Sequence, residues 1–277
     1  MKSLTSLEIL NAVSESSVDK ASGKFLKLLI LAVLAGAYIA FGAQASAMAS
    51  FNLTADAATV GIGKLVSAAV FPVGLMMVVL CGAELFTGNC MMITGVMDRK
   101  VKVSQMLRNW VIVYFGNMAG SLIIVLLISA SGLWDTGDGL LGAAVVKTAY
   151  TKVNLDFARA FILGIMCNWL VCLAVWMATG ASETVSKIFS IWFCIGLFVL
   201  SGFEHSVANM YFIPAGIAAA QNDMFVQLAG VDASCLTAAN FFIKNLLPVT
   251  LGNIAGGGIF VGMTYWTVHR KLGKKDI

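Results

Sequence analysis

"SGFEHSVANMYFI", residues 201–213, places an acid and a histidine side by side in an otherwise uncharged stretch. It repeats "CGAELFTGNCMMI", residues 81–93, in which Gly82, Glu84 and Asn89 recur as Gly202, Glu204 and Asn209, each 120 positions later. A carboxylate at the centre of a membrane helix costs roughly 2.5–3.5 kcal/mol, and glycine lets the chain leave a helix. Each stretch therefore predicts a helix that breaks at its glycine, with the glutamate in a structural role, accepting the free backbone N–H groups of the break.

A second repeat extends the first. Between "NWVIVYFGNMAG" at 109–120 and "NLLPVTLGNIAG" at 245–256, residues recur 136 positions apart, among them Asn109 and Asn245, Gly116 and Gly252, Asn117 and Asn253, Ala119 and Ala255, Gly120 and Gly256. The longer spacing predicts a longer loop between the fifth and sixth spans. With three spans in each half, the halves (about 25–134 and 155–271) must insert in opposite senses, related by a pseudo-two-fold axis in the membrane plane.

The composition indicates a membrane protein. Hydrophobic residues make up 59% of the 277 residues and charged residues 12%, whereas about a quarter of a soluble domain is charged. A membrane-crossing helix needs about 20 apolar residues, and the uncharged runs are 28–55, 65–83, 109–134, 160–182, 188–203 with 206–222, and 245–268. The prediction is an all-α protein with six transmembrane helices, the second and fifth broken.

Lys and Arg residues predict the orientation. Most of the 18 cluster in the first 27 residues, the 99–108 loop and the C-terminal tail. We therefore expect a cell (inner or plasma) membrane protein with both termini cytoplasmic, a cytoplasmic segment at 1–24 and a single transmembrane domain at 25–277. The net charge of +4 reflects this bias and does not suggest nucleic-acid binding. Five of the six cysteines lie in apolar spans, so no disulfide, metal site or cofactor is expected.

His205 has no histidine counterpart, because the matching position is Leu85. Symmetry therefore does not require it, and with an unperturbed pKa of about 6.5 a histidine can exchange a proton with a weak acid. On composition alone, Lys152 is an ordinary lysine in a loop.

Five motifs carry a family resemblance: "GAELFTGN" (82–89), "NWVIVYFGNMAGS" (109–121), "CNWLVCLAVWMA" (167–178), "SGFEHSVANM" (201–210) and "LPVTLGNIAGG" (247–257). On these motifs the chain resembles the formate/nitrite transporter family, which includes hydrosulfide channels. The resemblance implies an aquaporin-like protomer, an inverted 3+3 repeat in a homopentamer, and a pore through each protomer rather than along the central axis.

The resemblance also implies roles for particular residues. The permeant-contacting positions fall on His205, Lys152, Thr87, Asn168 and Asn209, with Thr87 in the loop of the second span. The apolar constrictions fall on Phe71, Leu75, Leu85, Phe86, Val171 and Phe198. The expected function is passage of a small monovalent weak-acid anion through the lipid bilayer, with formate first and nitrite or hydrosulfide as alternatives, and with protonation near His205.

Two other functions fit less well. A water or glycerol channel would carry Asn-Pro-Ala at the breaks, where this chain reads "TGN" and "VAN". An intramembrane enzyme using Glu204 and His205 would need a nucleophile, metal cluster or cofactor motif, and adjacent helical residues point in different directions. We therefore expect no catalytic residue and no enzyme activity.

Overall fold

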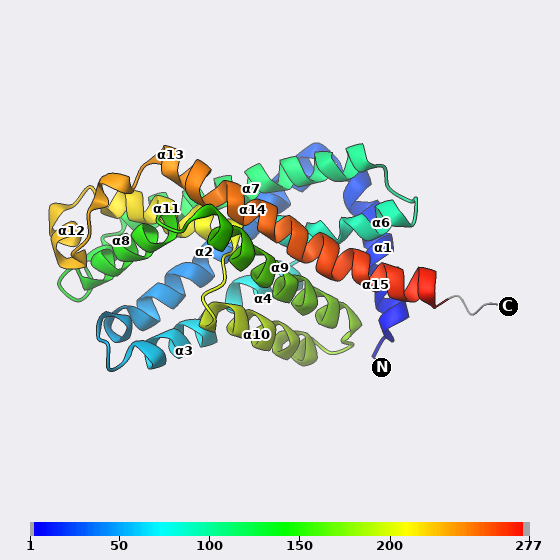
Figure 1. The fold of residues 1–277 in the computed structure, drawn as a ribbon, viewed down its shortest axis with the longest axis horizontal. Coiled ribbons are helices and arrows are strands. Elements are labelled where there is room, and N and C mark those ends of the chain that lie inside the picture. Colours follow the sequence, from blue (N-terminus) through cyan, green and yellow to red (C-terminus); the bar gives the residue numbers. More distant parts are fainter. Residues whose placement is uncertain (1–2, 274–277) are drawn as a thin grey trace.

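The computed structural model describes residues 3–273, which are helical with short connections (Figure 1). Lys2 and the tail lysines Lys274 and Lys275, used above for the orientation, lie outside this range. The chain begins with α1 (Ser6–Ser22), which Thr5 and Glu8 cap reciprocally. The predicted N-terminal segment is therefore an ordered helix.

Within residues 3–273, five helices are long and apolar enough to cross a membrane: α2 (Phe25–Ala55), Val60–Leu80, α7 (Val103–Ala130), α9 (Phe157–Gly180) and Ala238–Leu272. Val60–Leu80 consists of α3 (Val60–Val70) and α4 (Val73–Leu80). The predicted fifth span is divided between two shorter apolar helices, α10 (Thr184–Leu200) and α11 (Ser206–Ala219). The chain is thus a multi-pass membrane protein by length and composition.

The last long helix contains several helical geometries. It comprises α13 (Ala238–Asn240), α14 (Leu247–Ile254) and α15 (Thr264–Trp266), with wider π-helical turns at Phe241–Leu246, Ala255–Met263 and Thr267–Leu272.

Short elements join the long ones. After α4 come α5 (Phe86–Asn89), a 3₁₀ turn (Cys90–Met92) and α6 (Ile93–Met97). A 3₁₀ turn (Leu133–Asp135) and α8 (Leu140–Val153) lie between α7 and α9. The long connection expected before the sixth span contains α12 (Asp223–Ala229) and a 3₁₀ turn (Ala233–Cys235).

Glycines let two pairs of helices approach closely. A Cβ at Gly120 of α7 would lie 1.9 Å from the Val33 carbonyl oxygen of α2. A Cβ at Gly256, in the helical segment after α14, would lie 2.2 Å from the Ile165 carbonyl oxygen of α9. Small residues at such positions are typical of helix packing in membranes. The α2–α7 and α9–α14 contacts therefore use corresponding repeat positions.

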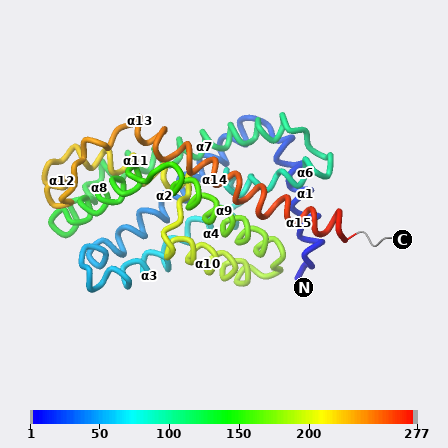
Figure 2. The backbone as a smooth tube through the Cα atoms, viewed as in Figure 1, coloured from blue at the N-terminus to red at the C-terminus, as the bar shows by residue number. Residues whose placement is uncertain are grey.

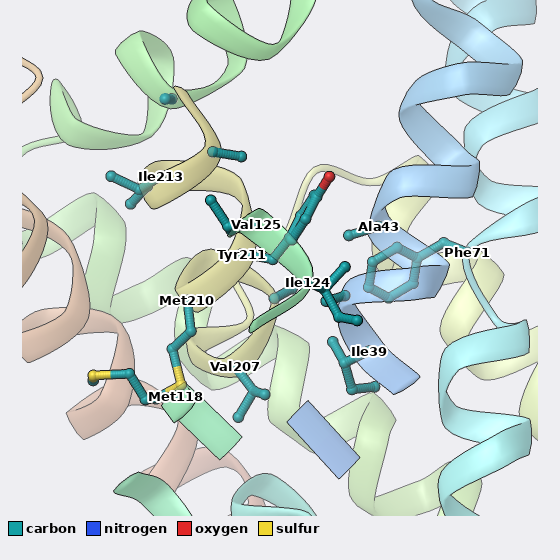
Figure 3. Close-up of a cluster of buried hydrophobic side chains, with 14 of the residues drawn as sticks. Ile39, Ala43, Phe71, Met118, Ile124, Val125, Val207, Met210, Tyr211 and Ile213 are labelled. Atoms are coloured by element: carbon teal, nitrogen blue, oxygen red, sulfur yellow. The ribbon is translucent and has the colours of Figure 1, made fainter. Parts of the chain in front are cut away.

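The main core lies where α2, α7 and α11 meet, and Figure 3 shows Ile39, Val125 and Tyr211 there among other buried side chains. Along the long axis, α1, α6 and α15 lie at one end, and α8 and α12 lie at the other (Figures 1 and 2). The connections after α4 and α10 lie between these two ends.

Candidate functional site

Each predicted break contains a glycine whose backbone conformation favours glycine over other residues. After α4 the chain is non-helical to Leu85, and Gly82 has φ +73°. After α10 it is non-helical to His205, and Gly202 has φ +72°. A Cβ at either glycine would meet nothing within 4 Å. The requirement is therefore the left-handed backbone and not space.

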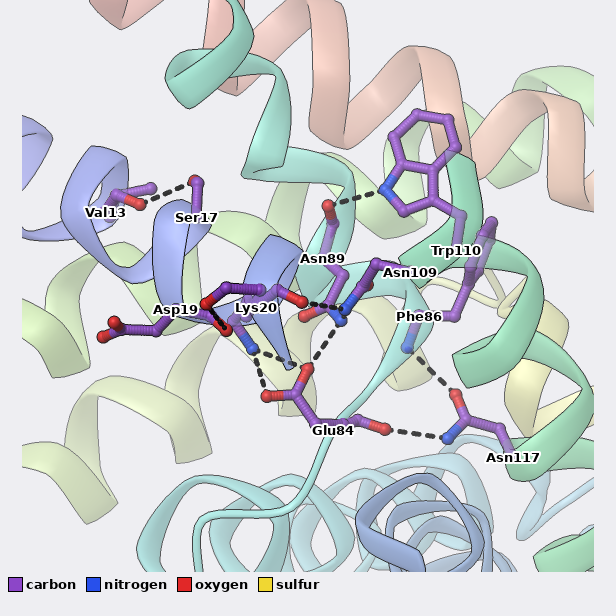
Figure 4. A network of polar contacts seen from close by, with 11 residues as sticks. Val13, Ser17, Asp19, Lys20, Glu84, Phe86, Asn89, Asn109, Trp110 and Asn117 are labelled. Carbon is purple, nitrogen blue, oxygen red and sulfur yellow. Dashed lines mark hydrogen bonds and ion pairs between the residues drawn. The ribbon is translucent and has the colours of Figure 1, made fainter. Parts of the chain in front are cut away.

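An asparagine from a neighbouring helix holds each break. Asn117 of α7 donates to the Glu84 carbonyl oxygen at 2.9 Å and accepts the Phe86 N–H at 2.9 Å (Figure 4). Asn253 of α14 does the same with the Glu204 carbonyl oxygen at 3.0 Å and the Ser206 N–H at 2.9 Å. These bonds satisfy backbone groups that a broken helix leaves unpaired inside the protein.

The Glu84 carboxylate lies in a network of side chains. Its two oxygens each lie 2.8 Å from Lys20 Nζ of α1, and it accepts the Asn89 amide at 2.7 Å (Figure 4). Asn89 also donates to Asn109, whose amide donates to the Lys20 carbonyl oxygen. This network attaches α1 to the first break.

The Glu204 carboxylate lies in a matching network. It accepts Lys152 Nζ of α8 at 2.7 Å and the Asn209 amide at 2.7 Å, and Asn245 donates to the Lys152 carbonyl oxygen. We expected these carboxylates to accept backbone N–H groups, but the donors to them are side chains. The backbone groups at the breaks are bound by Asn117 and Asn253 instead. The ion pair and the amide hydrogen bonds offset the desolvation cost of each carboxylate.

His205 and Glu204 point to different partners. His205 Nδ1 accepts the Ala208 N–H at 3.0 Å as the N-cap of α11, and Nε2 lies 2.9 Å from Thr87 Oγ1. Because Nδ1 accepts, the proton of the neutral imidazole is on Nε2, which donates to Thr87. The two broken segments therefore meet through one hydrogen bond between buried side chains.

Four cavities follow one another through the molecule, and neighbouring cavities share lining residues. The α8 vestibule contains Lys64, Lys147 and Lys152. The histidine chamber, of about 160 Å³, shares Lys152 and Glu204 with it and reaches His205. A central cavity of only about 10 Å³ shares Phe71, Phe198 and His205 with the chamber. The α1 vestibule shares Leu75 and Leu85 with the central cavity and contains Lys20 and Glu84.

Most of the predicted apolar set surrounds the narrow central cavity. Phe71, Leu75, Leu85, Val171 and Phe198 line it, together with Ile39 and Ile195. Phe86 is not among these residues, because its ring packs edge-on against Tyr114 (4.9 Å between centroids) and Trp110.

The other predicted residues lie close to this line. Asn209 lines the histidine chamber, whereas Asn168 is buried, lines none of the four cavities and donates to the Thr87 carbonyl oxygen at 3.1 Å. Thr87 is in α5 and Lys152 in the last turn of α8, so neither is a loop residue as expected. Lys152 Nζ also lies 5.4 Å from the Phe212 ring centroid, a cation–π contact.

The sequence reasoning missed several of these residues. Asn109 and Asn245 recur in the repeat, so the sequence did indicate that they have matching roles. Nothing in the sequence indicated a role for Lys20, because α1 precedes the repeated segments. Nothing in the sequence indicated a role for Ile39 and Ile195 either, because an isoleucine in a uniformly apolar helix does not show which way its side chain points.

A line of cavities runs through this multi-pass helical membrane protein, with charged residues on both sides of an apolar centre. This arrangement is typical of a transport protein. The family model "Formate/nitrite transporter" matches residues 7–267, and the chain belongs to that family. A probable formate transporter of Methanothermobacter thermautotrophicus is 42% identical over 259 residues (88% of this chain, 89% of the relative). The formate channel FocA of Escherichia coli K12 is 40% identical over 264 residues (92% and 90%).

Solved structures give the same result. A pentameric formate channel with formate bound superposes with a TM-score of 0.79 at 36% identity, covering 89% of this chain and 98% of that one. An ion channel of the FNT family superposes with a TM-score of 0.79 at 30% identity, covering 94% and 98%. These relatives are channels and transporters, not enzymes.

Proposed function

We propose that the chain is a membrane channel for a small monovalent weak-acid anion, with formate as its principal permeant, and that it is not an enzyme. The observation that carries this proposal is the line of cavities, in which a lysine–glutamate pair stands on either side of a tiny apolar cavity next to His205. The names of the relatives, which are formate channels and transporters, support formate before nitrite and hydrosulfide.

The finer architecture belongs to the same proposal. We infer six spans in an aquaporin-like inverted repeat, with α10 and α11 forming a broken fifth span and α3–α6 a broken second span. The matched Glu84 and Glu204 networks support this inference. The single channel domain is 25–277, following a cytoplasmic segment at 1–24, and both termini are cytoplasmic in a cell membrane. The pentameric relative supports a homopentamer.

The first step of permeation is capture of the anion. In the α8 vestibule, Lys64, Lys147 and Lys152 raise the local anion concentration by electrostatic attraction. Lys152 also keeps Glu204 neutralised, so the carboxylate does not repel the permeant. Lys20 is placed to do the same in the α1 vestibule, opposite Glu84.

The second step is neutralisation, because a bare anion faces a large desolvation cost in a cavity lined by Phe71, Leu75 and Phe198. A proton joins the permeant next to His205, so the neutral acid crosses the apolar region. Thr87 contributes a hydrogen bond: when His205 Nε2 donates to Thr87 Oγ1, the Thr87 hydroxyl proton is left for the permeant.

The position of His205 sets a condition on proton exchange. Nε2 can release its proton only if another proton arrives at Nδ1, and Nδ1 is bonded to the Ala208 N–H. Exchange through His205 therefore requires the N-cap bond of α11 to open. This separates two roles of the residue, capping and proton exchange.

The variant His205→Asn tests the proposal, because asparagine is a good N-cap but cannot exchange protons near neutral pH. Flux of formate, nitrite and hydrosulfide into proteoliposomes is measured across external pH, with pentamer integrity checked by size-exclusion chromatography. We expect wild-type formate uptake to rise as pH falls and the intact variant to lose this dependence. An unchanged pH profile would refute the role of His205, and absence of flux in the wild type would refute the channel.

A further inference from the structure

Two serine hydroxyls in the histidine chamber have no role in the proposed function so far. Ser46 of α2 and Ser67 of α3 both line this chamber, together with Lys152, Glu204 and His205. Ser46 is 3% exposed, and its Oγ is in hydrogen-bonding contact with Ser67 Oγ. They lie on the side of the Phe71–Phe198 pair that faces the α8 vestibule, since those two phenylalanines separate this chamber from the central cavity.

The two other serine and threonine hydroxyls of α2 are used differently. Ser50, one turn after Ser46 on α2, donates to the Ser46 carbonyl oxygen at 2.8 Å, and Thr54 donates to the Ser50 carbonyl oxygen at 3.0 Å. Such bonds to the preceding turn satisfy a hydroxyl within its own helix. Ser46 and Ser67 instead meet each other across two helices, at the wall of a cavity.

The hydrogen-bonding capacity of this pair is incomplete. Each hydroxyl has one proton and two lone pairs, and one proton is used between the two residues. One O–H donor and several lone pairs therefore remain at the chamber wall. A protonated oxyacid, with a carbonyl-type acceptor oxygen and an O–H donor, matches this combination, whereas hydrogen sulfide has only weak S–H donors and a weak sulfur acceptor.

We propose that Ser46 and Ser67 form a hydrogen-bonding subsite for small oxyacids, of the carboxylic-acid or nitrous-acid class, and that it favours them over hydrogen sulfide. This rests on the proposed channel function and adds its selectivity. The subsite holds the permeant once it is protonated beside His205, in the chamber that Lys152, Ser46 and Ser67 also line. The pair thus acts before the apolar central cavity.

The test compares Ser46→Ala, Ser67→Ala and the double variant with Ser50→Ala as the matched control on α2. Formate, nitrite and hydrosulfide flux are measured in parallel in proteoliposomes. Because a lost hydrogen bond changes a barrier modestly, we expect formate and nitrite flux to fall roughly three- to tenfold relative to hydrosulfide. Ser50→Ala leaves the ratio unchanged, and Ser67→Thr, which keeps a hydroxyl at a half-buried position, stays near the wild type.

Retained hydrosulfide flux shows that the pore of each variant is intact. An equal fall for all three permeants, or an unchanged ratio in the double variant, would overturn the subsite while leaving the channel function in place. A wild type that carries none of the three overturns the channel function and the subsite with it.

Discussion

Lys20 and Lys152 make matching contacts at opposite ends of the line of cavities. Lys20 Nζ lies 2.8 Å from the Glu84 carboxylate, and Lys152 Nζ lies 2.7 Å from the Glu204 carboxylate. An asparagine amide from a repeat position donates to the backbone carbonyl of each lysine. Two helices that share no motif, α1 and α8, therefore deliver the same chemical group to the two breaks.

Lys152→Met should lower both flux and stability. Removing one partner of a buried ion pair costs about 3–5 kcal/mol, because the other charge is left unpaired. In Lys152→Met/Glu204→Gln no carboxylate is left unpaired, so we expect stability to recover toward the wild type. The Lys152 ammonium group, which lines both the α8 vestibule and the histidine chamber, is not restored, so formate flux stays low in the double variant.

Thermal unfolding and formate flux separate these effects. Lys147→Met serves as the control for the effect on stability, since Lys147 lines the same vestibule without an ion pair to Glu204. A double variant with wild-type flux would contradict the role of Lys152 in attracting the anion.

Gly120→Ala should disrupt the contact between α2 and α7. The added Cβ would lie 1.9 Å from the Val33 carbonyl oxygen, and backbone cannot move aside as a side chain can. We expect a loss of a few kcal/mol, in the range of about 1–3 typical of overpacking. Gly61→Ala on α3 is the control, because its Cβ meets nothing within 4 Å. A Gly120 variant with the thermal stability of the Gly61 variant would show that the two helices can separate freely.

The two interruptions of helical structure could be predicted from the sequence because their key residues are identical and chemically costly. Glu84 and Glu204 each follow a glycine by two residues in an apolar stretch, and the chain is non-helical at 81–85 and 201–205. Lys20 could not be predicted as the partner of Glu84, since this contact depends on how α1 folds back across the first break. The resemblance assigned Phe86 to the constriction. Its position in the sequence does not say which way a ring points at the start of a four-residue helix, and the ring packs against Tyr114 and Trp110 instead.

Asp98 should make the attachment of α1 depend on pH. Its carboxylate accepts Ser14 Oγ of α1 at 2.7 Å and Trp266 Nε1 of α15 at 2.7 Å, and pairs with Arg270 at 3.3 Å. Partial burial raises the pKa of Asp98, but the hydrogen bonds from Ser14, Trp266 and Arg270 outweigh it, and the net pKa is lowered. The stabilisation is therefore present above the unfolded-state pKa and is lost as pH falls through the folded-state pKa.

Hydrogen exchange of residues 6–22 measures this attachment. Protection of α1 should fall as the pH is lowered below about 4, the ordinary range of an aspartate. Asp98→Asn should lower the protection at neutral pH and remove its dependence on pH in this acidic range. Equal protection of α1 in both proteins at every pH would contradict the attachment through Asp98.

Phe198→Ala should widen the passage and relax its size selectivity. Phe198 lines the central cavity of about 10 Å³, packs edge-on against Phe71 with ring centroids 5.6 Å apart, and stacks on His205 at 5.9 Å. Without this ring, an acid one carbon larger than formate fits more easily. Because one carbon in an apolar pocket discriminates by roughly tenfold or more, we expect acetate flux to rise about tenfold relative to formate.

Phe193→Ala is the matched control, since Phe193 is on the same helix but 63% exposed. Its acetate-to-formate ratio should equal that of the wild type, and Phe198→Leu should give an intermediate ratio. An intact Phe198→Ala pentamer with the wild-type ratio would mean that selection by size occurs elsewhere along the line of cavities, and the Phe71–Phe198 pair would then serve packing alone.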